Sequence, residues 1–329
     1  KGMGSKWKWL AKIFAFFGVG VGLFGIGTFT QVNGISSAVN NFFDPNNGWS
    51  VNLFGQDYSW TVVITGVILT LLVGLVIIGG LKRIAHVSQV IVPFMSVLYV
   101  VFALILLVFN ADKIPGAIVE IVESAFGFRA AAGGALGAII IAMQKGIARG
   151  IFSNEAGLGS APIAAAAAKT KEPVRQGLVS MTGTFIDTII ICTMTGLCIV
   201  ITGSWTIGLE GVAVTTNAFQ AGMPFWPAEI SSFVLMLCLV FFAFTTILGW
   251  DYYSERCLEY LVNGRQKVVS VYRWIYILAI FIGPYMTVEA VWVIADIFNG
   301  LMALPNLVAL VCLSGVISKE TKQYFSKDK

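Results

Sequence analysis

The sequence predicts an all-α polytopic membrane protein, and three observations support that prediction. Of the 329 residues, 57% are hydrophobic and 12% are charged, whereas a soluble domain has roughly 25% charged residues. The mean hydropathy is +0.84. The apolar residues come in runs of about 20, the length that crosses a bilayer, and do not alternate as in strands. This composition excludes a soluble enzyme, a disordered chain and a nucleic-acid-binding protein.

Eight apolar runs are long enough to cross a membrane, so we expect about eight transmembrane helices in a single transmembrane domain, residues 1–329. We expect the last span to be broken near Pro305. A shorter amphipathic stretch, residues 114–126, carries Glu120 and Glu123 and should lie at the membrane surface. The eight runs are residues 9–38, 60–80, 87–109, 130–149, 174–202, 229–253, 268–285 and 288–317.

The basic residues predict which ends of these spans face the cytoplasm. Lys and Arg gather on the cytoplasmic side of membrane proteins. With eight spans and the start inside, all but two of the 21 Lys and Arg residues fall on one side, the exceptions being Lys113 and Arg129. Both chain ends should therefore be cytoplasmic.

Glycines and amides inside the spans each allow two interpretations. Residues 20–25 match G-x-G-x-x-G, but an apolar span favours close helix packing over nucleotide binding. Glycines cluster at residues 133–137, before Met143 and Gln144. They form either a packing groove or a broken helix that exposes backbone polar groups. Gln31 either bonds between helices or contacts a polar solute.

The stretch RGIFSNEAGLGSAP at residues 149–162 is the most distinctive in the chain. Ser153 or Asn154 can cap the Ala-rich helix expected to follow, with Glu155 near its positive end. The functional alternative is a cytoplasmic gate in which Glu155 pairs with Arg149 or Lys145.

Two carboxylates and two hydroxyls inside spans suggest ion chemistry. Asp187 and Asp296 either bind a proton or cation or are hydrogen-bonded structural groups. Thr245 and Thr246 offer hard oxygen donors, the kind that hard cations prefer, although threonines in helices often bond the preceding turn. Thr246 and Trp250 share a helix face.

Several stretches together resemble the alanine/glycine:cation symporter family, and they occur in the family's order across nearly the whole chain. They are RGIFSNEAGLGSAP (149–162), Arg175-Gln176-Gly177, Phe185-Ile186-Asp187-Thr188, FAFTTILGW (242–250), Glu255-Arg256-Cys257 and residues 296–302. The resemblance implies a LeuT-type bundle with two inverted five-helix repeats. The eight spans would then be core helices three to ten.

That correspondence also implies helices before Lys1. We expect one extra helix and core helices one and two to precede this chain, so the chain resembles a partial transporter. Core helix one contributes to the amino-acid and sodium sites in this fold. We therefore expect the 329-residue chain alone not to transport.

The resemblance carries roles only to residues that match. Thr245 and Thr246 are similar to the sodium-site hydroxyls, and Trp250 is similar to a pocket wall. Gln31, Thr246 and Trp250 become candidate substrate contacts, together with Met143 and Gln144 of the expected broken helix six. Candidates for gating or coupling are Arg149, Asn154, Glu155 and Asp187. The chain departs from the familiar pattern at Thr28, Asp251 and Ser254.

The function implied by the resemblance is sodium-coupled symport of a small neutral amino acid across the cytoplasmic membrane by alternating access. The partners would be the amino acid, Na⁺ as coupling ion and the lipid bilayer, with no other cofactor. Alanine and glycine stay alternatives, as do sodium and proton. Other classes are a channel, or an intramembrane enzyme using Asp187 and Asp296. A single histidine, His86, and no metal-ligand spacing argue against the enzyme.

Overall fold

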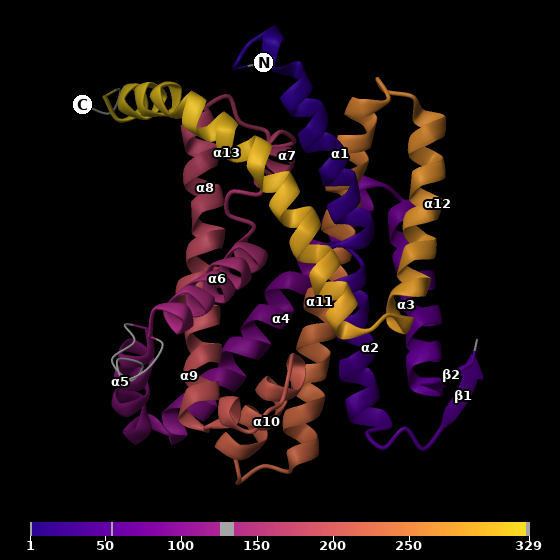
Figure 1. Cartoon of the computed structure of the whole chain (residues 1–329), viewed down its shortest axis with the longest axis vertical. Coiled ribbons are helices and arrows are strands. Elements are labelled where there is room, and N and C mark those ends of the chain that lie inside the picture. Colours follow the sequence, from indigo (N-terminus) through magenta and orange to yellow (C-terminus); the bar gives the residue numbers. More distant parts are fainter. Residues whose placement is uncertain (1, 54, 126–134, 327–329) are drawn as a thin grey trace.

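Long helices running between two ends of the molecule make up most of the structure, a computed structural model that describes residues 2–53, 55–125 and 135–326 (Figure 1). A β-hairpin pairs Ser50 with Ser59. The helices are α1 (Lys8–Phe24), α2 (Phe29–Phe43), α3 (Trp60–Ile78), α4 (Leu81–Phe109), α5 (Ile114–Ala125), α6 (Ala135–Asn154), α7 (Ala161–Ala165), α8 (Pro173–Phe185), α9 (Thr193–Ile201), α10 (Val212–Gly222), α11 (Ala228–Leu261), α12 (Gln266–Ile282) and α13 (Val288–Ser326). The strands are β1 (Ser50–Leu53) and β2 (Gln56–Ser59), and the short turns are η1 (Ser5–Trp7), η2 (Ala111–Lys113), η3 (Ile186–Cys192), η4 (Ser204–Thr206) and η5 (Gly283–Tyr285).

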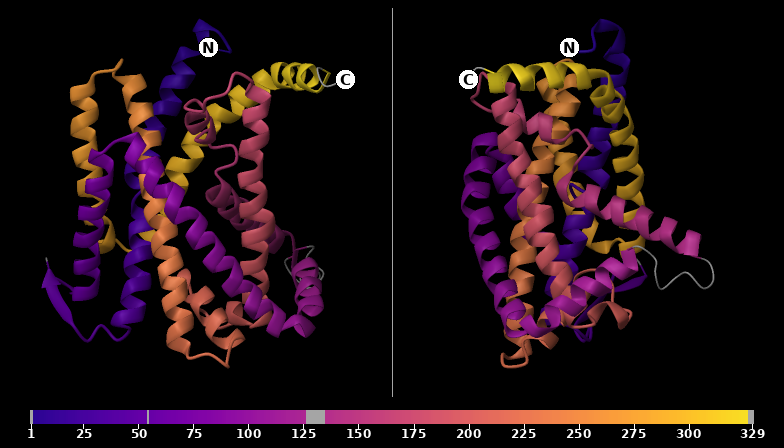
Figure 2. Two further views of the ribbon diagram at one scale, coloured as in Figure 1. Left: turned by 180° about the vertical axis from the view of Figure 1, so that it is seen from behind. Right: turned by 90° about the vertical axis from the view of Figure 1, so that its left-hand side faces the viewer.

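Within the described residues, seven helical segments are long and apolar enough to cross a membrane. They correspond to seven of the eight predicted spans and confirm an all-α polytopic protein. The remaining predicted span, residues 130–149, corresponds to α6. Residues 130–134, with Gly133 and Gly134 of the expected broken helix, lie outside the described residues. Figure 2 shows α6 lying obliquely to the long helices, and the count of eight stays a prediction.

The first predicted span is divided between α1 and α2, which corrects the continuous run expected over residues 9–38. A Cβ on Gly27 would lie 2.6 Å from Cβ of Trp250, so the chain crosses α11 there too closely for a side chain. Polar side chains satisfy carbonyls freed at the break. Thr28 Oγ1 donates to Leu23 O at 2.5 Å, and Gln31 Nε2 donates to Ile26 O at 3.0 Å. Internal partners are required because the bilayer core offers no water.

The last predicted span also differs from expectation, because α13 continues through Pro305 without a break. A proline inside a helix removes one hydrogen bond and commonly bends the helix instead of ending it. Figure 1 shows α13 curving toward the C-terminus. The amphipathic stretch is confirmed as a separate helix, α5, in which only Ala117 is buried.

Helix α11 is the centre of the bundle and contacts α1, α2, α4 and α12. Its tightest crossing is with α1. A Cβ on Gly18 would lie 2.7 Å from Cys257 Sγ, and one on Gly22 would lie 2.4 Å from Ser254 Cβ. The G-x-G-x-x-G stretch therefore serves helix packing, because small residues let the two backbones approach.

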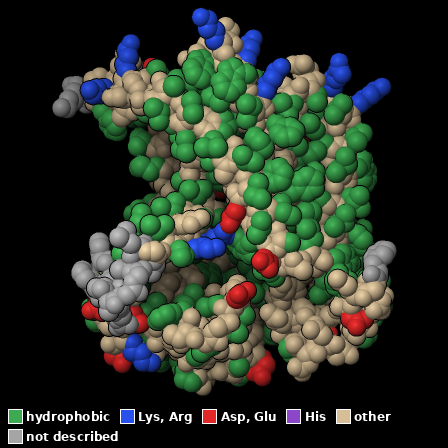
Figure 3. Space-filling model, viewed as in Figure 1, with side chains coloured by type: hydrophobic (Ala, Val, Ile, Leu, Met, Phe, Trp, Pro, Cys, Tyr) green, Lys and Arg blue, Asp and Glu red, His purple; other side chains and the backbone are tan. Residues whose placement is uncertain are grey.

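Basic side chains gather at the end of the molecule where both termini lie (Figures 1 and 3). Broad apolar surfaces cover the sides, with exposed residues such as Leu75, Val108 and Trp274. This distribution is what the positive-inside rule requires if the basic end faces the cytoplasm.

The crossing of α1 and α11 predicts opposite effects for two glycine substitutions. Gly22→Ala should lower the free energy of unfolding by about 1–3 kcal/mol, since Ser254 leaves no room for a methyl group. Gly34→Ala is the matched control, because nothing lies within 4 Å of its Cβ position, and alanine favours a helix by roughly 0.5–1 kcal/mol. Denaturant titration in detergent would measure both, and equal destabilisation would contradict the crossing.

Candidate functional site

The segment that follows α6 leaves helical geometry and turns back on itself. Helix α6 ends at Asn154, and Glu155, Gly157 and Gly159 have φ values of 56°, 83° and 89°. The Asn154 side chain accepts a hydrogen bond from the backbone N–H of Ala156 at 2.8 Å. A positive φ is unusual for a glutamate. We call residues 155–160 the turn segment.

Glu155 joins the turn segment to α11. Its Oε1 accepts a hydrogen bond from Trp250 Nε1 at 2.8 Å, and its Oε2 accepts one from Ser160. The Trp250 side chain is 1% exposed, and Ser160 is fully buried. These two hydrogen bonds hold the Glu155 carboxyl group between the turn segment and α11.

The end of α6 is also joined to the π-helical turn η3. Ser153 Oγ donates to Asp187 Oδ2 at 2.7 Å, and Asn154 Nδ2 donates to Thr188 Oγ1 at 3.0 Å. Single π-helical turns inside helices occur frequently at functional sites. Asn154 and Asp187, which the sequence suggests as coupling residues, therefore lie on two elements that touch each other.

A third set of contacts runs to α13. Arg149 Nη2 donates to Asp296 Oδ1 and Oδ2 at 2.6 and 2.5 Å, and the guanidinium lies 4.3 Å from the Trp292 ring centroid. Asn306 Nδ2 donates to Gly157 O at 2.9 Å. The ion pair is half-exposed, with side-chain exposures of 38% and 43%. Solvent and salt therefore weaken the attraction between its two charges.

These contacts correct two sequence interpretations. Glu155 pairs with neither Arg149 nor Lys145. The positive φ of Glu155 turns its carboxylate toward α11, while Arg149 lies earlier on α6 and faces α13. Ser153 and Asn154 do not cap the Ala-rich helix, because α7 begins only at Ala161, beyond the turn segment.

The threonines of α11 bond within their own helix. Thr245 Oγ1 donates to Phe242 O at 2.9 Å, and Thr246 Oγ1 donates to the same carbonyl at 3.0 Å. A hydroxyl that donates one hydrogen bond keeps its acceptor lone pairs. Both oxygens therefore retain the capacity to bind a cation.

The structure brings only some of the candidate residues into the interior. Gln31 is buried on α2, whose neighbour is α11. Met143 and Gln144 are exposed on α6, as is Lys145. Asp187 and Asp296 engage different partners, Ser153 and Arg149, and no contact joins the two acids in the described part of the chain. The paired acids that an intramembrane enzyme would need are not seen there.

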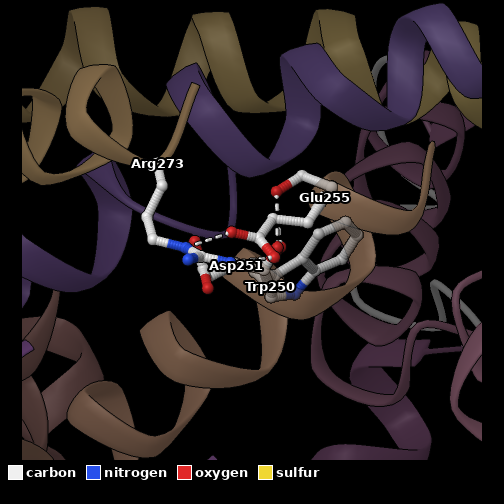
Figure 4. Close-up of polar contacts among 5 residues, drawn as sticks. Trp250, Asp251, Glu255 and Arg273 are labelled. Carbon is white, nitrogen blue, oxygen red and sulfur yellow. Dashed lines mark hydrogen bonds and ion pairs between the residues drawn. The ribbon is translucent and has the colours of Figure 1, made fainter. Parts of the chain in front are cut away.

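A cluster of ionisable side chains on α11 and α12, in which the two acids are buried, is not predicted by the sequence analysis. Arg273 donates from Nε and Nη2 to the two oxygens of Glu255, at 2.6 and 2.9 Å (Figure 4). Asp251 lies one turn before Glu255 and is 1% exposed. The four-residue spacing of Asp251 and Glu255 is the sequence signal that could have placed both acids on one helix face. Their neighbour Arg273 lies on another helix, so spacing could not reveal it.

Comparison with known proteins identifies the family. The chain matches the profile of the sodium:alanine symporter family over residues 1–329. It is 53% identical over 331 residues to an uncharacterized transporter of Haemophilus influenzae, covering 100% of this chain and 68% of that protein. It is 44% identical to the sodium/alanine symporter AgcS of Methanococcus maripaludis, covering 96% of this chain and 65% of that protein.

A further relative is the probable sodium/glutamine symporter GlnT of Bacillus subtilis, which is 38% identical over all of this chain and 64% of that protein. The chain thus spans about two thirds of the length of these relatives. Together with the seven apolar helices, the profile match places the chain in the cell membrane as a multi-pass protein. The chain belongs to the sodium:alanine symporter family.

Proposed function

We propose that this protein carries out sodium-coupled symport of a small neutral amino acid, alanine or glycine, by alternating access in a LeuT-type bundle. The observation that carries the proposal is the match to the sodium:alanine symporter family over residues 1–329. The hydrogen bond between Trp250 and Glu155 joins two of the family-like stretches across 95 residues of sequence. Two of the relatives are named as a sodium/alanine symporter and a probable sodium/glutamine symporter. Membership of the family supports the same chemistry here.

The proposed sodium ligands include the hydroxyl oxygens of Thr245 and Thr246 on α11. Trp250 lies one turn further on the face shared with Thr246, and its indole reaches Glu155. A sodium ion bound to these hydroxyls therefore contacts α11, the same helix whose Trp250 binds the turn segment. Coupling requires that ion binding favours the substrate-ready arrangement, and by linkage that substrate favours ion binding equally.

Contacts to the amino acid are proposed for Gln31, Met143, Gln144, Thr246 and Trp250. The buried indole supplies an apolar wall that excludes large side chains by steric clash. Arg149, Asn154, Glu155 and Asp187 are the proposed gating and coupling residues. They tie the end of α6 to η3, α11 and α13. A change in these polar contacts would let the turn segment adopt a second arrangement.

The first test is sodium-driven accumulation. Protein expressed from its natural gene and reconstituted in vesicles should concentrate labelled alanine or glycine when sodium is high outside, because the ion gradient drives substrate uphill. Replacing external sodium by potassium should abolish accumulation. A channel would only equilibrate the label across the membrane, and such equilibration, or labelled amino acid that accumulates equally in potassium, would contradict the proposal.

The second test concerns Thr246. Thr246→Val removes the hydroxyl while keeping the branched shape, so the sodium concentration for half-maximal uptake should rise roughly tenfold, equivalent to about 1.4 kcal/mol. Thr246→Ser restores an oxygen and should return the sodium dependence close to that of the native protein. If Thr246→Val changed only the amount of folded protein and left the sodium dependence unaltered, the hydroxyl would be structural.

A further inference from the structure

Asp251 is a buried acid whose carboxylate lacks a full set of partners. The residue is 1% exposed, and its Oδ1 is buried without a hydrogen-bond partner among the described residues. It directly follows Trp250 on α11. In Figure 4 the Trp250 indole lies on the side away from Arg273, while Asp251 lies between them. Trp250 and Asp251 are consecutive residues, but their side chains therefore lie in different surroundings.

The nearest cation is already engaged. Arg273 gives two donors to the two oxygens of Glu255, which is the bidentate geometry that matches one guanidinium to one carboxylate. The cluster thus holds two buried acids, Asp251 and Glu255, and one base, Arg273, whose side chain is 28% exposed. If Asp251 were ionised, its buried negative charge would be left without a paired cation.

The other groups that face Asp251 do not supply the missing charge. From α12, the Tyr276 hydroxyl lies 2.8 Å from Ile247 O and 3.2 Å from Gly27 O, and the Tyr272 hydroxyl lies 3.3 Å from Val19 O. Both phenols thus point their hydrogens at carbonyls. On α11 itself the next basic side chain is Arg256, which is paired with Glu259 at 2.5 Å. From α1, residues 18–22 contribute glycine, valine and backbone and no charged side chain.

We propose that Asp251 is a proton-binding site, neutral in the arrangement described here, and that release of its proton to water accompanies the change to another arrangement. The step is the ionisation of one carboxyl, in which the O–H bond breaks and the proton passes to water. The unpartnered oxygen, the engaged arginine and the burial of the carboxyl group all favour the neutral form here. Ionisation favours an arrangement in which Asp251 reaches water or a free cation.

The position of Asp251 connects this proton to the transport site, and this part rests on the proposed function. Asp251 adjoins Trp250, and Tyr276 bonds to Gly27 at the break between α1 and α2. Opening the surroundings of Asp251 would therefore disturb both the turn segment and the first span. We infer that a proton moves together with the amino acid, as an ion additional to sodium.

Infrared spectroscopy tests the protonation without requiring transport. Protein labelled with ¹³C-carboxyl aspartate should show the carbonyl stretch of a neutral, labelled acid at pH 7, and the band should disappear in Asp251→Asn. Glu229→Gln, at the exposed start of the same helix, should leave the band unchanged. The native protein can be titrated directly, so the test does not depend on the variant folding. Absence of the labelled neutral-acid band at pH 7, so that all the labelled aspartates absorb as carboxylates, would overturn the proposal.

Proton movement tests the coupling. Addition of alanine to vesicles should produce a pH change inside, carried by the native protein and by Glu229→Gln but lost in Asp251→Asn. Sodium-driven uptake should persist in Asp251→Asn, which separates failure of this inference from failure of the proposed symport. If alanine moved no protons in the native protein while sodium drove uptake, the coupling would be overturned. The same conclusion would follow if Asp251→Asn moved protons normally.

Discussion

The placement of the turn segment against the bundle depends on one hydrogen bond, from Trp250 Nε1 to Glu155 Oε1 at 2.8 Å. Trp250 lies in the C-terminal part of α11, where its Cβ meets Gly27 at the break in the first span and its indole holds the turn segment. Two interruptions of regular helix therefore meet at one buried side chain. Because Trp250 is 1% exposed, its indole N–H has no solvent partner to replace the Glu155 carboxyl group.

The same constraint explains how irregular backbone is tolerated at membrane depth. Where α1 gives way to α2, the side chains of Thr28 and Gln31 take up carbonyls that the helix no longer satisfies. Where α6 ends, Asn154 and Asn306 bond the backbone of the next residues. Irregular segments survive in a bilayer only when protein groups satisfy them. Polar side chains at these positions are thus required by the fold and also supply the chemistry of a site.

The sequence predicted the spans well because a run of about 20 apolar residues is a strong signal. It also predicted that the glycines of α1 serve packing. It missed the break at Gly27, because a close approach to Trp250 from more than 200 residues away leaves no local pattern. The predicted pairing of Glu155 with Arg149 or Lys145 was wrong for a similar reason. Backbone dihedral angles and helix faces decide which side chains meet, and spacing in the sequence does not. Family resemblance marked the residues of the turn segment without revealing which helix they contact.

A double-mutant cycle between Trp250 and Glu155 tests the central claim most directly. The free energy of unfolding in detergent would be measured for Trp250→Phe, Glu155→Ala and the double variant. A direct hydrogen bond predicts that the two effects are non-additive by at least about 0.5 kcal/mol, because either change alone removes the same contact. Trp274→Phe with Glu229→Ala, two exposed positions, should be additive. Additive effects of Trp250→Phe and Glu155→Ala would contradict the claim that this contact holds the turn segment on α11.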